Sequence, residues 1–175
     1  MEAFRNRLIK RLKHLKKWAR RNDVACFRVY DQDLTEFPLV VEWYSGKVVV
    51  WIYSQKVALN YESIIAVLKD VFELDGADIF IKERFPQKKG FSYQKKSNSH
   101  QKWYVEEHGL RFELNLSDYL DVGLFLDHRL MRKRVYNMSK NKRVLNLFSY
   151  TASFSCYAAA GGAVDTTSVD LNPNY

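Results

Sequence analysis

The sequence has little cysteine and histidine, and it has no long hydrophobic run. Cys26 and Cys156 are its two cysteines, and neither belongs to a CxxC or Cys/His pattern, so we expect both to be reduced core residues of a cytoplasmic protein. The four histidines are scattered, a distribution that predicts no metal centre. No apolar stretch has the length of a membrane span, and the basic N-terminus lacks the apolar segment of a secretory signal.

Acidic residues are outnumbered by basic ones. The 175 residues contain 28 Lys and Arg against 20 Asp and Glu, a formal net charge of +8. A hydrophobic content of 47% excludes a disordered chain, so the surplus charge belongs to a folded surface. It favours a polyanionic partner, nucleic acid before anionic membrane, although a merely soluble basic surface explains it too.

The first 116 residues have the pattern of a small α+β domain. The segment "YSGK" between two β-rich runs predicts a hairpin, and the polar segment 86–101 predicts a loop. From apolar spacing we expect helices at 2–21 and 61–74 and strands at 24–31, 38–44, 47–53, 78–85, 102–107 and 110–116. The first helix is strongly basic outside its apolar stripe. One interpretation of this basic face is contact with RNA or a membrane. The other is an outer face that is only solvated.

The pattern changes near Ser117, where a second domain, 117–175, is predicted to begin. A turn precedes a helix that we expect Asp121 to cap, and a strand, a helix and another strand follow at 143–148, 153–160 and 165–171. Strand, helix and strand within so few residues predict a right-handed βαβ unit with parallel strands. The fold class is therefore α/β, a small α+β domain followed by the opening of a Rossmann-like domain.

The turn after the first of these strands is the strongest candidate for a site. Ligands of parallel α/β sheets bind beyond the carboxyl ends of the strands, where Asn146 to Ser153 supply hydroxyl and backbone N–H groups. Asp170 follows about twenty residues later, at the position of an acid that accepts hydrogen bonds from a ribose. The GxGxxG pattern of pyrophosphate cofactors is absent, which favours S-adenosylmethionine over a nicotinamide cofactor. An ordinary βα turn without a ligand is the alternative.

Longer stretches resemble a known family. The segments "GLFLDHR" and "LNLFSYT" followed by "VDL" resemble the C-terminal half of the bacterial bifunctional 23S ribosomal RNA guanine methyltransferase. That half methylates guanine N7 and belongs to the class I enzymes that use S-adenosylmethionine. Upstream, "RLKHLKKWARRNDVACFRVYDQDLTEFPLVVE" and "KERFPQKKGFSYQK" are also similar to this family, so the resemblance covers nearly the whole chain.

The resemblance also implies roles for particular residues. Asp170 would hold the ribose of the cofactor, and Asp127 and Arg129 would close the pocket, although a surface ion pair between these two is the alternative. The methionine end of the cofactor would be lined by Asn146, Phe148, Ser149, Tyr150 and Thr151. Cations and rings in the loop suit single-stranded RNA, unless the loop is only solvated; these candidate RNA-binding residues are Lys88, Lys89, Phe91, Tyr93, Lys95 and Lys96.

The sequence departs from the family in two places. Ala152 stands where the family usually has glycine, and the Asp-Pro-Pro-type catalytic segment is missing. We therefore expect an incomplete fragment of a longer bifunctional enzyme, inactive alone, with 23S ribosomal RNA as its partner. The alternatives are a non-enzymatic RNA-binding module and another adenosine-dependent enzyme, such as a nicotinamide oxidoreductase. With few neighbouring strands, the residues after about Arg143 should be loosely packed and 1–116 the stable part.

Overall fold

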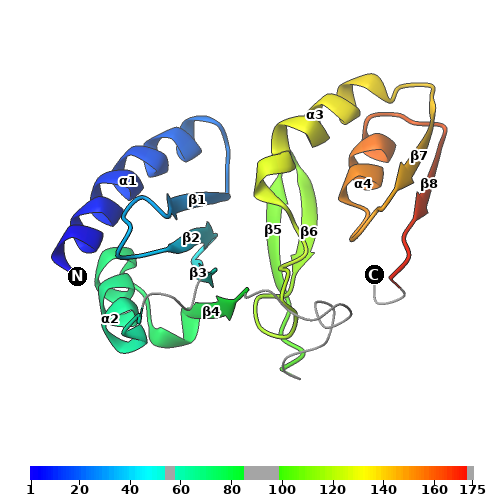
Figure 1. Cartoon of the computed structure of the whole chain (residues 1–175). Helices are drawn as coiled ribbons and strands as arrows, with labels where there is room; N and C mark the ends of the chain where they lie inside the picture. Colours follow the sequence, from blue (N-terminus) through cyan, green and yellow to red (C-terminus); the bar gives the residue numbers. More distant parts are fainter. Residues whose placement is uncertain (54–57, 85–98, 173–175) are drawn as a thin grey trace.

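The computed structural model of the chain describes residues 1–53, 58–84 and 99–172. Its elements follow the predicted order, with boundaries that differ by a few residues (Figure 1). The helices are α1 (Glu2–Arg21), α2 (Tyr61–Phe72), α3 (Arg129–Met138) and α4 (Ser153–Ala160). The strands are β1 (Cys26–Asp31), β2 (Leu39–Tyr44), β3 (Lys47–Ile52), β4 (Ile79–Glu83), β5 (Trp103–Glu107), β6 (Leu110–Leu114), β7 (Arg143–Leu147) and β8 (Asp165–Val169).

A four-stranded sheet of order β1-β2-β3-β4 forms the N-terminal part. The predicted hairpin is confirmed, because β2 and β3 pair antiparallel around Ser45 and Gly46, both of which have positive φ. Strand β4 runs parallel to β3, and α2 makes the crossover between them. The side chain of Asn60 caps α2 by accepting a hydrogen bond from the N–H of Ser63 at 2.9 Å.

The two faces of this sheet carry separate hydrophobic cores. Helices α1 and α2 cover one face, where Phe4, Leu8 and Leu68 are fully buried (Figure 1). The β5–β6 hairpin covers the other face. This second core also contains Leu124 from the segment before α3 and Tyr157 from α4, so it joins residues on both sides of the boundary expected near 116. The two predicted domains therefore share buried apolar surface.

The segment before α3 differs from its prediction. Asp121 does not cap the helix, because α3 begins at Arg129, after a 3₁₀ turn over Leu126–His128. The carboxylate of Asp121 instead pairs with the guanidinium of Arg84 at 2.7 Å. Upstream, the carboxylate of Asp118 accepts hydrogen bonds from the N–H groups of Ser99 and His100. These contacts hold the chain in successive turns, so an α-helix cannot start there.

The prediction that both cysteines lie in the core is wrong for one of them. Cys26 is buried, and burial raises the pKa of its thiol to about 12, so the thiol stays protonated at neutral pH. Cys156 is exposed on α4. Its neighbour Tyr157 is fully buried, and adjacent positions on a helix point in different directions. Apolar surroundings in the sequence did not distinguish these two positions.

Strands β7 and β8 form a separate parallel pair, and α4 connects them as predicted (Figure 1). Large apolar side chains of this pair are exposed, among them Leu145, Leu147 and Val169. This exposure agrees with the expectation that few neighbours cover the strands. No helix in the described residues is long and apolar enough to cross a membrane.

Candidate cofactor-binding site

The turn between β7 and α4 has an unusual backbone. Phe148, Tyr150 and Ala152 all have φ between 52° and 56°, in the left-handed region that non-glycine residues rarely adopt. The N–H of Ser149 donates to the carbonyl oxygen of Val169 at 3.1 Å, which continues the β7–β8 ladder into the turn. Such strain is often found at ligand sites, where the surrounding structure maintains it.

Asp170 lies beside this turn at the carboxyl end of β8. Its Oδ2 accepts a hydrogen bond from the N–H of Tyr150 at 2.7 Å, and its Oδ1 accepts one from the N–H of Asn172 at 2.9 Å. These two bonds favour the charged form and lower the pKa of the Asp170 carboxyl. The carboxylate is exposed and ionised at neutral pH, with lone pairs left to accept from the hydroxyls of a ligand.

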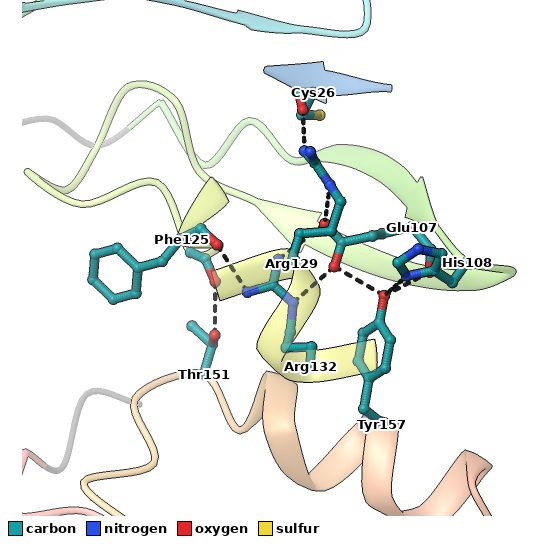
Figure 2. Close-up of polar contacts among 9 residues, drawn as sticks. Cys26, Glu107, His108, Phe125, Arg129, Arg132, Thr151 and Tyr157 are labelled. Carbon is teal, nitrogen blue, oxygen red and sulfur yellow. Dashed lines mark hydrogen bonds and ion pairs between the residues drawn. The ribbon is translucent and has the colours of Figure 1, made fainter. Parts of the chain in front are cut away.

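The other predicted residues of the turn have different environments. The side-chain amide of Asn146 donates to Oγ of Ser155 at 3.0 Å, which holds it between β7 and α4. The side chain of Phe148 projects into solvent and is 88% exposed. The hydroxyl of Thr151 donates to the carbonyl oxygen of Gly123 at 2.6 Å (Figure 2). Thr151 thus fastens the turn to the segment that precedes α3.

The segment before α3 contributes a second wall. The ring of Phe125 lies 5.1 Å from the ring of Tyr150, measured between centroids. Phe125, Tyr150 and Asp127 line a cavity of about 50 Å³ that is bounded on the sheet side by Glu42 and Trp51. Asp127 is exposed at its rim. The structure therefore brings Asp127 to the same place as the β7–α4 turn.

Arg129 does not line this cavity, and it does not form the surface ion pair considered as its alternative role. Its side chain turns toward Glu107, with Nε 3.0 Å from Oε2, and it also donates to the carbonyl oxygen of Cys26 (Figure 2). Arg129 thereby connects α3 to β1 and to the end of β5. In this structure its contacts are structural.

A buried polar network surrounds Glu107 (Figure 2). The carboxylate accepts from Nε and Nη2 of Arg132 at 2.7 and 2.9 Å and from the hydroxyl of Tyr157 at 2.9 Å. Burial opposes the ionisation of Glu107, but the bonds and charge of Arg132 outweigh it and lower the pKa of Glu107. Arg132 also donates to the carbonyl oxygen of Phe125 at 2.8 Å, so the network supports the cavity wall.

Sequence reasoning did not identify this network. Glu107 follows another glutamate in a strand, and Arg132 lies among other basic residues of α3, so neither stands out in the sequence. Tyr157 is the one large polar side chain of α4, whose other residues are Phe154 and small side chains, and this was the signal that the sequence offered. Only the tertiary fold brings β5, α3 and α4 together, so no local pattern in the sequence predicts these contacts.

The predicted RNA-binding residues of the loop, Lys88, Lys89, Phe91, Tyr93, Lys95 and Lys96, lie outside the described residues. At the margins of the loop, Lys102 pairs with Glu113 at 3.0 Å, and the buried Lys82 donates to the carbonyl oxygen of Tyr119. Within the described ranges, no group of three or more His, Cys, Asp and Glu side chains is placed to hold a metal ion.

Known proteins match both the sequence and the fold. A ribosomal RNA large subunit methyltransferase K/L from Hahella chejuensis is 44% identical over 99% of this chain, and one from Magnetococcus marinus is 43% identical. This chain spans only about a quarter of the length of these curated relatives, 25% in both cases.

Solved structures of proteins assigned as methyltransferases are also similar to this chain. A protein from Streptococcus mutans assigned as a SAM-dependent methyltransferase superposes with a TM-score of 0.78 at 28% identity, over 99% of this chain and 46% of that one. A crystal structure assigned as a methyltransferase complexed with S-adenosylhomocysteine has a TM-score of 0.69 at 27% identity, over 97% of this chain and 45% of that one. The sequence profile of the S-adenosylmethionine-dependent methyltransferases matches residues 36–174. The chain therefore belongs to this family, and the expected cofactor, S-adenosylmethionine, is confirmed as the cofactor of the family.

Proposed function

We propose that this chain is part of an enzyme that methylates guanine N7 of 23S ribosomal RNA, and that the β7–α4 turn holds the S-adenosylmethionine. The observation that carries the proposal is the position of the Asp170 carboxylate, which the N–H of Tyr150 fixes against the turn at 2.7 Å. The names of the relatives support ribosomal RNA as the substrate. Because the chain covers a quarter of those relatives, we propose that it acts within a longer bifunctional enzyme.

In this proposal, each residue near the turn has a separate task. The ionised Asp170 accepts hydrogen bonds from the ribose hydroxyls, and Ser149 to Thr151 enclose the methionine end. Asp127, at the rim of the cavity, carries the negative charge that suits the positively charged amino group of the cofactor. The hydrogen bond from Asn146 to Ser155 of α4 holds the start of the turn in position. In place of the direct role that the resemblance implied for Arg129, we propose that it orients the segment before α3.

The chemistry makes modest demands on the protein. S-adenosylmethionine supplies an electrophilic methyl group, and guanine N7 has an unprotonated lone pair, so the reaction needs no strong base. The methyl–sulfur bond breaks as the methyl–nitrogen bond forms, and the positive charge moves from sulfur to the base. The rate then depends on aligning the two reactants in a site without water. No Asp-Pro-Pro segment to hold the guanine occurs in these 175 residues, so we expect no methyl transfer by this chain alone.

The loop residues complete the proposed RNA contacts. Lys88, Lys89, Lys95 and Lys96 are proposed to bind phosphates, and Phe91 and Tyr93 to stack on unpaired bases. Replacing the four lysines with Ala should flatten the salt dependence of RNA binding, whereas replacing the two rings should lower affinity at an unchanged slope. Binding to large-subunit RNA that neither set alters would show that the loop is only a connection.

Calorimetry with S-adenosylhomocysteine tests the cofactor site. This ligand should bind more tightly than NAD, and Asp170→Ala should weaken its binding by about 1.5–3 kcal/mol, the usual value of a hydrogen bond to a charged group. Asp165→Ala is the matched control, because Asp165 is an exposed acid at the opposite end of the same strand. Tighter binding of NAD, or equal effects of the two substitutions, would contradict the proposal.

A further inference from the structure

The cations of α1 fall into two groups, apart from Lys16, whose ammonium lies 5.8 Å from the centroid of the Trp43 ring. Those beside its buried stripe have acidic partners on the domain: Arg5 pairs with Asp70 at 2.7 Å, and Arg7 pairs with Asp33 at 2.9 Å. Arg11 donates to the carbonyl oxygen of Val29 at 3.2 Å. These contacts attach the helix to the sheet and to α2.

The second group points away from the domain, and we call it the outer stripe of α1: Lys10, Lys13, Lys17, Arg20 and Arg21. All five are exposed, and none forms an ion pair within the part of the chain that the structure describes. Lys10, Lys13, Lys17 and Arg21 follow one another at spacings of three or four residues, and Arg20 lies three residues after Lys17, so the five share one face that extends about 16 Å along the axis. Glu2 is the only acid of the helix, so the positive charge of this face is not compensated locally.

The packing of α1 decides between the two polyanions considered from the sequence. A helix that lies on a membrane inserts an apolar face between the lipids. In this structure the apolar stripe of α1 is already used, since Phe4, Leu8 and Leu12 are buried against the sheet. Only the charged face remains available, and such a face binds phosphates without inserting. The geometry therefore favours nucleic acid over a membrane.

The residues on the outer stripe also indicate the form of the RNA. Proteins that bind single strands combine cations with aromatic rings that stack on unpaired bases. None of the five residues of the outer stripe has an aromatic ring, and the five cations sit on a rigid rod; the exposed imidazole of His14 lies beside Lys10 and Lys17 on the same side of the helix. Double-helical RNA presents a regular phosphate backbone and is recognised mainly by shape. We propose that the outer stripe of α1 binds the phosphate backbone of double-helical RNA; this rests on the proposed function only in taking RNA as the substrate.

The test compares two variants with equal charge. In the stripe variant, Lys10, Lys13, Lys17 and Arg21 become Gln, a good helix former that preserves α1. In the control variant, four exposed cations of α3, β7 and the turn between them, Arg134, Lys140, Lys142 and Arg143, become Gln. Both variants lower the formal net charge by four. The probe is a 20-base-pair RNA duplex of arbitrary sequence, titrated into the full chain between 50 and 200 mM salt.

The stripe variant should bind the duplex more weakly, and the slope of log K against log salt should fall by about 3 to 4, roughly 0.9 for each lost phosphate contact. The control variant should keep most of the slope. Equal losses in both variants, an unchanged stripe variant, or no duplex binding by the parent chain would overturn the proposal. Stronger dependence on the stripe for poly(U), or for vesicles containing phosphatidylserine, would overturn it as well.

A separate measurement keeps this result independent of the cofactor proposal. None of the five residues of the outer stripe lines the cavity beside the β7–α4 turn. Helix α1 belongs to the core on one face of the four-stranded sheet, and Tyr157 of α4 belongs to the core on the other face (Figure 1). The stripe variant should therefore bind S-adenosylhomocysteine as the parent chain does. If the parent chain binds duplex but not S-adenosylhomocysteine, the proposed cofactor site fails and the RNA surface stands.

Discussion

Arg132 donates two hydrogen bonds to the carboxylate of Glu107, from Nε at 2.7 Å and from Nη2 at 2.9 Å, and both side chains are buried. The pair connects α3 to the β5–β6 hairpin. Tyr157 of α4 and Arg129 join the same carboxylate, so residues from β5, α3 and α4 converge on one charge. The backbone of Phe125 is attached to this group through Arg132, and the ring of Phe125 packs on Tyr150. The network thus connects the second core to the candidate cofactor turn.

Removing Arg132 should destabilise the chain strongly. Arg132→Leu leaves the carboxylate of Glu107 buried with fewer donors, and breaking a buried pair in this way costs roughly 3–5 kcal/mol. Arg5→Leu breaks the exposed pair with Asp70 and should cost at most about 1 kcal/mol. Urea unfolding of both variants gives the comparison. A loss below about 1 kcal/mol for Arg132→Leu would mean that the network is not a major source of stability.

The contribution of Glu107 should depend on pH with a definite sign. Its pKa is lower in the folded chain than its ordinary value of 4.5, so the folded state favours the ionised form. The stability that it contributes is complete above the unfolded pKa and is lost as pH falls through the folded pKa. The difference in unfolding free energy between the parent chain and Glu107→Gln should be constant near neutral pH and shrink below about pH 4.5. A difference that grows on acidification would show that the sign is wrong.

The backbone conformation at Ala152 explains why the family usually has glycine at this position. Its φ of 56° lies in the left-handed region, where the methyl group of alanine costs about 1–2 kcal/mol and glycine has no such penalty. Part of this gain is offset by the larger backbone entropy of glycine in the unfolded chain. Ala152→Gly should therefore raise the free energy of unfolding by about 0.5–1 kcal/mol.

Ala159→Gly provides the matched control for that prediction. The substitution is identical and lies in the helix that follows Ala152, but Ala159 has a helical backbone and is exposed, so glycine should destabilise by about 1 kcal/mol. Chemical denaturation measures both variants. The same sign for the two substitutions would contradict the conformational explanation.

The sequence predicted the elements of this fold well because their apolar spacing is regular. The βαβ unit, the hairpin around Gly46 and the position of Asp170 at the end of β8 all followed from local patterns. The segment before α3 did not, because its turns depend on contacts with distant residues, such as Arg84 with Asp121. Arg129 likewise has a partner, Glu107, that lies 22 positions away and on another element. Local patterns carry no information on such pairs.

Amide hydrogen exchange should be slower in the four-stranded sheet than in the β7–β8 pair, because neighbouring elements cover more of the four-stranded sheet. Strand β2 has a neighbour on each side and buried residues throughout most of its length. Among the strands that the structure describes, β7 pairs only with β8, and its residues Leu145 and Leu147 are 62% and 55% exposed. Backbone bonds that open without uncovering much apolar surface open at low free energy, and a two-stranded sheet is marginal in water.

Amides of β7 and β8 should therefore have protection factors at least tenfold lower than those of β2 and β3, a difference of about 1.4 kcal/mol in opening free energy. Adding S-adenosylhomocysteine in excess should raise the protection of β7, β8 and the turn between β7 and α4, because ligand binding stabilises the closed state. The amides of β2 serve as the internal reference for that change. Equal protection of the two sheets in the monomeric chain would show that contacts other than apolar coverage hold β7 and β8 in place.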